Sequence, residues 1–121
     1  MKDNKEHIEM DIADTIMEKP VSFSIGSRHF YIYPPTLGKT YLLARLFKEL
    51  DANDSVIATN PYMEALRLCQ MKKDIVCRVL AYSTYSKKIE LFDSRNVNVR
   101  AAFFSKQLDM EELATLLVLI L

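Results

Sequence analysis

Glycine is scarce in this sequence of 121 residues, where Gly26 and Gly38 are the only two. Tight turns between many short strands draw heavily on glycine, so the scarcity disfavours a many-stranded β fold. Cysteine is equally rare, and Cys69 and Cys77 stand eight residues apart in a helical pattern. That spacing is about 12 Å along a helix, too long for a disulfide, so we expect two reduced core residues of a cytosolic protein.

Neither sign of charge is in excess, since the chain has 16 basic and 16 acidic residues. A domain built mainly to hold nucleic acid usually carries a basic excess, so this class is disfavoured. Residues 1–19 are polar and acidic, with Ile8, Ile12 and Ile16 at helical spacing. This N-terminal arm is compatible with a short amphipathic helix and with a mobile segment. Its charged start is unlike a signal peptide.

The clearest local pattern is a β-hairpin. Residues 21–25 alternate between apolar side chains and serine, Gly26-Ser27 signals a turn, and residues 28–33 alternate again. Pro34 is expected to end the hairpin, because proline cannot donate a hydrogen bond to a strand ladder.

Helical patterns dominate the remainder. Thr36 is the expected N-cap of a first helix, and its apolar stripe comprises Leu37, Tyr41, Leu43, Ala44, Leu46, Phe47 and Leu50. Residues 51–59 are expected to form a loop, and Asn60-Pro61 to begin a helix that runs to about Ala81. The last helical patterns are Ile89–Phe92, Val97–Leu108, and Met110–Leu121 behind a capping box of Asp109 and Glu112.

These patterns predict an α+β fold that is mainly helical, with an N-terminal β-hairpin followed by about four helices. The length suits one core, so residues 20–121 are expected to form a single domain.

The stretch PPTLGKT, residues 34–40, ends like a nucleotide-binding P-loop. A P-loop requires a glycine five residues before Gly38, and Tyr33 stands there instead. Pro34 and Pro35 also remove two amide donors from the loop that would hold the phosphate. We therefore interpret the stretch as a junction between strand and helix, in which Gly38 permits close packing of the first turn.

Side chains suited to catalysis do not form a recognisable pattern. His7 and His29 lack a second ligand at metal-binding spacing, the cysteines lack a CxxC spacing, and no serine stands in a GxSxG elbow. We expect a protein with no enzymatic activity, no cofactor and no metal.

Basic and aromatic side chains of the hairpin offer another interpretation. Arg28, His29, Tyr31 and Tyr33 are expected to share one face of the hairpin, where they would suit the stacking of nucleic-acid bases. The favoured interpretation is a solvent face whose tyrosines pack on a neighbouring helix, because a broader basic surround is lacking. A nucleic-acid-binding regulator would use Arg28, Tyr31, Lys72, Lys73 and Arg78.

The C-terminal run LATLLVLIL, residues 113–121, has no polar face after Thr115. Nine residues are less than half of the roughly 20 needed to cross a bilayer, so we expect neither a transmembrane span nor a membrane partner. A helix that is apolar all round must be buried centrally or covered by a partner or another copy of the chain.

The hairpin and junction resemble the small tail assembly chaperones of long-tailed bacteriophages and prophages. In that group a β-hairpin commonly precedes a P-x-T-L-G-like junction and a helical body. The matching residues here are Phe23, Ile25, Gly26, Phe30, Ile32, Pro35, Thr36, Leu37 and Gly38. The resemblance covers about 30 residues closely and the rest only as an order of helices.

The resemblance implies a protein of the bacterial host cytoplasm that coats the helical tape-measure protein during tail assembly and covers its apolar stripes. An apolar groove would hold an amphipathic helix of that partner. We expect the contacts to come from Leu113, Leu116, Leu117, Leu119 and Ile120, with Tyr41 and Phe47 as aromatic anchors or ordinary core residues. The alternative is a small structural subunit of a virion or other assembly, with the C-terminal helix as an oligomer interface.

Overall fold

The computed structural model describes residues 21–33, 37–85 and 94–121. Within them a two-stranded antiparallel hairpin precedes six helices, which confirms the α+β, mainly helical fold. The elements are β1 (Val21–Ile25), β2 (Arg28–Ile32), α2 (Leu37–Leu50), α3 (Asp54–Thr59), α4 (Pro61–Met71), α5 (Lys73–Ser83), α7 (Ser94–Gln107) and α8 (Met110–Ile120). The predicted N-terminal arm (residues 1–19), the Thr36 cap with its two prolines, and the segment Ile89–Phe92 lie outside the described residues.

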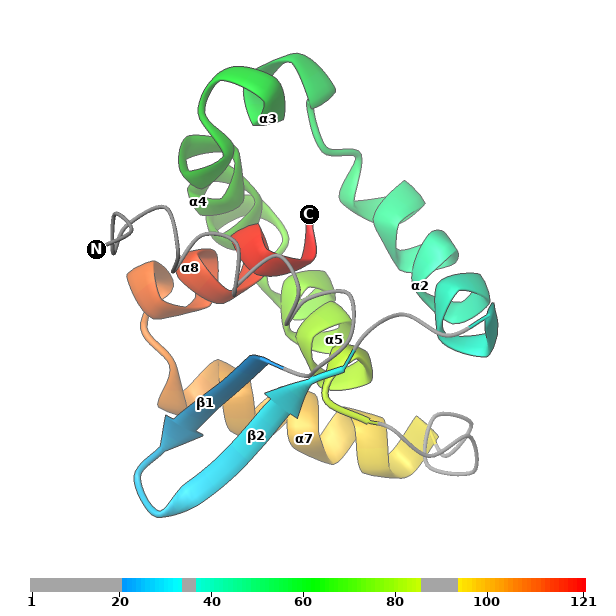
Figure 1. Ribbon diagram of the computed structural model, residues 1–121, viewed down its shortest axis with the longest axis vertical. Helices are drawn as coiled ribbons and strands as arrows, with labels where there is room; N and C mark the ends of the chain where they lie inside the picture. The colour runs from blue at the N-terminus through cyan, green and yellow to red at the C-terminus, as the bar shows by residue number, and fades with distance from the viewer. Residues whose placement is uncertain (1–20, 34–36, 86–93) are drawn as a thin grey trace, which may run out of the picture.

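Helix α5 lies in the middle of the molecule, and α2, α4, α7, α8 and β2 all pack against it (Figure 1). Its five consecutive residues from Val79 to Ser83 are buried, so the helix is covered on every side at that level. The core also contains Cys69 and Cys77, which are free and buried as the sequence predicts. Burial is the main cause that raises the pKa of each thiol to about 11, so both stay protonated at neutral pH.

The hairpin has the predicted strands and turn. Ile25 pairs with Arg28 across a two-residue loop, and Gly26, with φ of 60°, occupies its first position. Phe23 and Phe30 face each other across the ladder, with ring centroids 5.5 Å apart. Both rings reach Phe104 of α7, at 5.9 and 5.0 Å, so aromatic contacts hold the hairpin on that helix.

The predicted loop at residues 51–59 is wrong, because α3 forms there. Its N-cap is Asn53, whose side chain accepts a hydrogen bond from the Val56 amide at 3.2 Å. The buried Glu64 of α4 accepts from the Asn53 amide and pairs with Arg67 at 2.6 Å. A cap and a tertiary contact thus stabilise a helix too short to have a clear apolar period.

The single helix predicted from Asn60 to about Ala81 is two helices. Asn60 caps α4 and Pro61 begins it, as predicted, but the chain breaks at Lys72, where φ is −138°. The break brings the Lys72 ammonium to the end of α2, where it donates to the carbonyls of Glu49 at 2.6 Å and Leu50 at 3.1 Å. Lys72 therefore supplies a hydrogen-bond donor to carbonyl groups in the last turn of α2.

The apolar stripe predicted for α2 is partly wrong. Its buried residues are Lys39, Leu43, Leu46 and Leu50. Leu37 and Tyr41 are 91% and 71% exposed, so the buried face is rotated away from them. The predicted stripe had the wrong orientation because it was drawn from apolar residues alone, and Lys39 belongs to the buried face.

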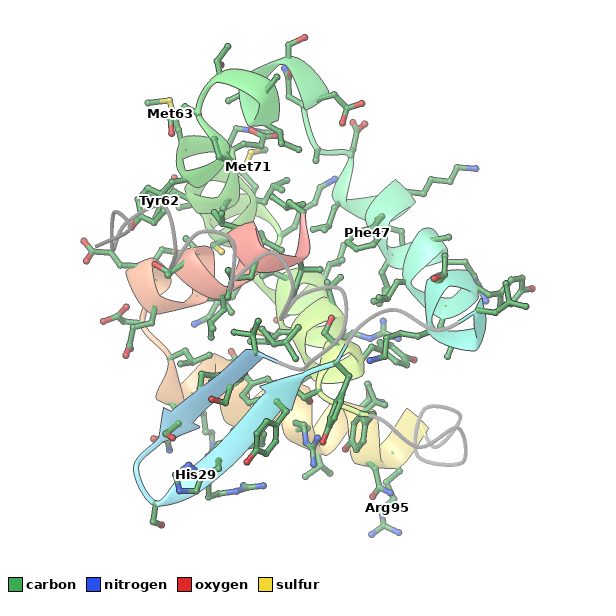
Figure 2. All side chains as sticks on the ribbon, in the orientation of Figure 1. His29, Phe47, Tyr62, Met63, Met71 and Arg95 are labelled. Carbon is green, nitrogen blue, oxygen red and sulfur yellow. The ribbon has the colours of Figure 1, made fainter. Side chains whose placement is uncertain are left out.

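Helix α8 begins at the predicted capping box. The Glu112 amide donates to Asp109 Oδ1 at 2.8 Å, and the Asp109 amide donates to Glu112 Oε1 at 3.0 Å. The helix packs mainly on α4 and also on α5. Among the side chains of α4, Tyr62, Met63 and Met71 are exposed (Figure 2).

The expectation that Gly38 permits close packing is wrong, because a Cβ built there meets no atom within 4 Å.

We predict that Gly38→Ala raises the free energy of unfolding by about 0.5 kcal/mol. Alanine lowers the conformational entropy of the unfolded chain and has a higher helix propensity than glycine. Gly26→Ala is the matched control: its surroundings are equally open, but its φ of 60° disfavours a side chain. It should lower stability by about 1 kcal/mol. Urea unfolding followed by circular dichroism measures both, and a loss of stability in Gly38→Ala would show that this glycine is needed.

Candidate binding groove

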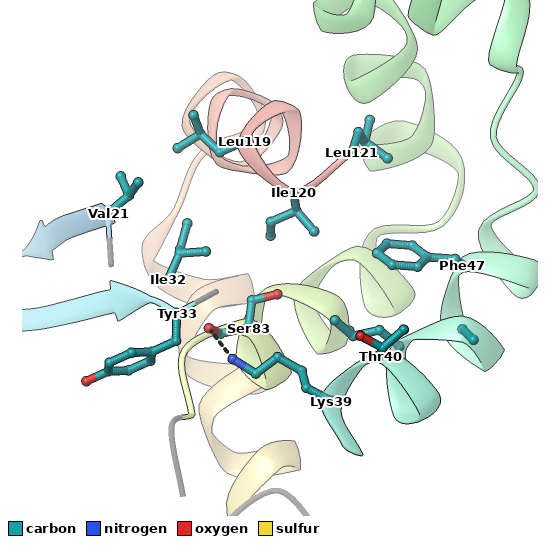
Figure 3. A pocket seen from close by; sticks show the side chains of 12 residues that line it. Val21, Ile32, Tyr33, Lys39, Thr40, Phe47, Ser83, Leu119, Ile120 and Leu121 are labelled. Atoms are coloured by element: carbon teal, nitrogen blue, oxygen red, sulfur yellow. Dashed lines mark hydrogen bonds between the residues drawn. The ribbon is translucent and has the colours of Figure 1, made fainter. Parts of the chain in front are cut away.

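An open apolar groove of about 440 Å³ lies between α2 and the end of α8 (Figure 3). The hairpin contributes Val21 and Ile32 to one side. The two helical walls are Leu43, Ala44 and Phe47 of α2, and Leu119, Ile120 and Leu121 at the end of α8. Polar groups come from Tyr33, Lys39, Thr40 and Ser83.

The groove exists because α2 and α8 both pack on α5. A second hollow of about 560 Å³ shares Ala44, Phe47, Ile120 and Leu121 with the groove. It extends past the end of α2 to Asp51, Asp54 and Ile57. The two hollows therefore adjoin at these shared residues, and the lining becomes partly charged toward α3, where Lys48, Asp51 and Asp54 contribute.

Lys39 lies at the floor of the groove and is 1% exposed. Its Nζ donates to the Ser83 carbonyl at 3.2 Å and lies 5.6 Å from the Tyr33 ring centroid. Ser83 is the last residue of α5, where the helix dipole favours a cation. Burial lowers the pKa of Lys39 to about 8, because the apolar surroundings disfavour the charged form. The groove thus combines apolar walls with one buried amine.

The structure brings three of the seven predicted contact residues to the groove: Phe47, Leu119 and Ile120. Leu113 and Leu117 are each 1% exposed and belong to the core, so placing them at a contact surface is wrong. Both lie on the side of α8 that packs on α4 and α5, which leaves them no free surface. Leu116 is half-buried against the core, and Tyr41 is exposed on α2 outside the groove lining.

Sequence reasoning missed Lys39, although its spacing contained a signal. Positions 39, 43, 46 and 50 follow the i, i+4, i+7, i+11 period of one helix face. A lysine in that register extends its aliphatic stem along apolar neighbours. The hairpin residues Val21 and Ile32 had no comparable signal, because their place beside α2 and α8 depends on tertiary packing.

The hairpin face proposed for base stacking is also revised. Arg28 does not share a face with His29, since successive residues of a strand point to opposite sides. Its guanidinium lies 4.4 Å from the Phe103 centroid and 5.0 Å from the Phe30 centroid, on the α7 side of the hairpin. Tyr31 and Tyr33 do lie together, with ring centroids 6.0 Å apart.

None of the helices in the described part of the chain combines the length and apolar content needed to cross a membrane. In residues 21–33, 37–85 and 94–121, no cluster of three or more His, Cys, Asp or Glu side chains is placed to hold a metal ion.

Comparison of the chain with protein-family models, with curated proteins and with solved structures found no match in any of the three.

The lowered pKa of Lys39 predicts a pH-dependent stability. At pH 7 the amine is charged in both the folded and the unfolded protein, so its desolvation cost is fully present. Between about pH 8 and 10.5 the folded protein binds fewer protons than the unfolded one, so the free energy of unfolding rises with pH. Relative to Lys39→Met, the free energy of unfolding of the wild type should therefore increase by up to about 3 kcal/mol over this range.

Urea unfolding at pH 7, 8.5 and 10 measures this shift. Taking the difference removes the opposite effect of the two buried cysteines, whose raised pKa makes folding less favourable as pH rises. The Ser83 carbonyl also accepts from the Tyr33 amide at 3.0 Å in the wild-type structure, so we expect it to keep one donor when Lys39 is replaced. Lys48→Met, an exposed lysine on the same helix, is the control and should show no such trend. A flat or falling difference for Lys39→Met contradicts a desolvated amine.

Proposed function

We propose that this chain is a non-enzymatic assembly chaperone that holds an apolar helical segment of a partner protein in the groove between α2 and α8. The observation that carries the proposal is the groove itself, whose walls are Phe47, Ile120 and other apolar side chains from two helices and the hairpin. An amphipathic helix presents its apolar residues as a stripe at i, i+3, i+4 and i+7, and such a stripe fits a groove between two helices.

The partner's chemistry follows from the walls. Leu119 and Leu121 are 37% and 36% exposed at the edge of the groove, so apolar surface is available to a ligand. The groove lining has fewer polar than apolar residues, which favours a ligand with an aliphatic stripe over a charged peptide. A helical partner with such a stripe aggregates when the stripe is exposed, and a chaperone prevents this by covering the stripe.

The sequence resemblance makes the proposal more specific. The hairpin and the junction of residues 34–38 resemble tail assembly chaperones of phages and prophages, whose partner is the tape-measure protein. We propose a partner of this type, met in the cytoplasm of a bacterial host. The groove begins at the hairpin that carries much of the resemblance, since Ile32 is one of the matching residues and lines the groove.

The structural-subunit alternative rests on the same exposed end of α8. In that case a second copy of the chain would cover Leu119 and Leu121. The two functions differ in their occupant, so one set of variants separates them.

We predict that a labelled amphipathic helical peptide with a leucine stripe binds the chain, and that Leu119→Asp or Ile120→Asp weakens binding by about tenfold or more. Burying a leucine or isoleucine side chain contributes about 1.5–3 kcal/mol, and a carboxylate in its place removes that term. Fluorescence anisotropy measures the affinity. Val99→Asp on α7, where the valine is 65% exposed and outside the groove, is the matched control and should bind as wild type does.

Two controls complete this experiment. A peptide of the same composition with its stripe scrambled should bind at least about tenfold more weakly, because it cannot present one apolar face. Light scattering on the same samples reports the oligomeric state. If the peptide does not bind, and wild type is a dimer that Ile120→Asp dissociates, the chaperone proposal is wrong and the subunit alternative takes its place.

A further inference from the structure

Charge is unevenly distributed in the described part of the chain. The hairpin (21–33) and α7 (94–107) contain Arg28, Arg95, Arg100 and Lys106 but no Asp or Glu. The carboxylates of the described residues lie on or beside α2, α3, α4, α5 and α8. The hairpin and α7 pack together, so they form one basic layer at one end of the molecule.

A cavity of about 240 Å³ opens in this layer, between β2, the end of α5 and α7. Two guanidinium groups line it, those of Arg28 and Arg100, and none of its lining residues is acidic. Tyr31 and Tyr33 supply ring faces, and Thr84 and Tyr85 complete the lining with hydroxyl groups that donate to the carbonyls of Ala81 and Asn96. The cavity therefore combines positive charge with aromatic surface.

Packing fixes both guanidinium groups. Arg100 lies 3.9 Å from the Tyr85 ring centroid, and its Nη1 donates to Thr84 Oγ1 at 3.0 Å. Arg28 stacks on Phe103 and Phe30, and within the described residues its guanidinium contacts rings and makes no hydrogen bond. Stacking occupies the flat face of a guanidinium and directs its N–H groups sideways, the geometry with which arginine binds phosphate.

The outer edge of β2 adds backbone donors. Ile25 and Arg28 close a two-residue loop, and hydrogen-bonded pairs alternate along an antiparallel ladder. The amides of His29, Tyr31 and Tyr33 therefore point away from β1. The Tyr33 amide follows this rule, since it donates to the Ser83 carbonyl at 3.0 Å. The Tyr31 amide lies one repeat earlier on the same edge, beside the cavity.

The geometry points to a binding site for a small phosphorylated aromatic compound of the nucleoside monophosphate class. Its phosphate lies between the guanidinium groups of Arg28 and Arg100 and the Tyr31 amide. At about 240 Å³ the cavity is smaller than the roughly 300 Å³ at which sites for drug-sized ligands begin, so it holds the phosphate and little more. The aromatic ring of the ligand then lies on Tyr31, which is 44% exposed and next to the Tyr33 ring.

This site is separate in chemistry from the apolar groove and does not depend on what the groove holds. The two share Tyr33 in their linings. Binding of a phosphorylated ligand and binding of a helical peptide are measured separately, so either proposal can fail while the other holds.

The test is calorimetric titration of the full chain at low salt with adenosine 5′-monophosphate, adenosine and inorganic phosphate. We expect the monophosphate to bind at least about tenfold more tightly than adenosine, because hydrogen bonds to charged groups contribute about 1.5–3 kcal/mol. Arg28→Met and Arg100→Met should each weaken binding by a similar factor. Arg95→Met changes an exposed arginine on the same helix, outside the cavity lining, and should leave the affinity within about twofold of wild type.

Arg100 also contacts Thr84 and Tyr85, so circular dichroism must confirm that its variant folds. If the Arg100 variant does not fold, Arg28→Met still decides the test, because Arg28 is exposed and makes no hydrogen bond in the described residues. Equal affinities for adenosine and its monophosphate, or no effect of Arg28→Met, would overturn the site. Inorganic phosphate binding as tightly as the monophosphate would remove the aromatic part of the proposal. Tighter binding of oligothymidylate at the same arginines would replace it with a nucleic-acid surface.

Discussion

The carbonyl of Ser83, at the end of α5, joins that helix to the hairpin and to α2, which both lie far earlier in the sequence. It accepts the Tyr33 amide at 3.0 Å and the Lys39 ammonium at 3.2 Å, so the end of the hairpin and the start of α2 meet at one atom. A carbonyl in the last turn of a helix lacks an intrahelical donor, and here tertiary donors replace it. Because α5 also packs on α4, α7 and α8, this contact places the hairpin and α2 on the helix around which the whole core is arranged. It acts together with the apolar packing of Leu43, Leu46 and Leu50, which also holds α2, one wall of the groove, on α5.

The groove and the buried amine follow from that arrangement. Lys39 reaches inward to the Ser83 carbonyl from the face of α2 that also buries its leucines, and Leu37 and Tyr41 lie exposed outside that face. Helix α8 buries Leu113 and Leu117 against the core, and its last residues extend beyond that contact toward α2. The space between them is lined by Phe47, Ile120 and Leu121. An apolar surface of this kind costs solubility when it is empty, and the helical partner that we propose would offset that cost.

Local signals made much of the fold predictable. The Gly26-Ser27 turn, the Asn60-Pro61 start of α4 and the Asp109 capping box depend on residues close in sequence, and the structure confirms all three. The failures came where a polar side chain works through a distant contact. Lys72 ends α4 by bonding the last carbonyls of α2, and Lys39 is buried because of Ser83. The groove was predictable only in part: the wholly apolar run of residues 113–121 indicated Leu119 and Ile120, but it could not distinguish them from Leu113 and Leu117, which face the core. Burial on one side of a wholly apolar helix is set by its neighbours and not by its own sequence.

The most direct test of the groove is methyl NMR of the chain, labelled at leucine, isoleucine and valine, during titration with the leucine-stripe peptide. Binding in the groove predicts that methyl signals of Ile32, Leu43, Leu119, Ile120 and Leu121 shift together, because these residues line the groove. Signals of Val76 and Leu80 in α5 and of the exposed Val99 should stay in place. Shifts confined to Val99 and other surface methyl groups outside the groove, or an unchanged spectrum at saturating peptide, would contradict the account.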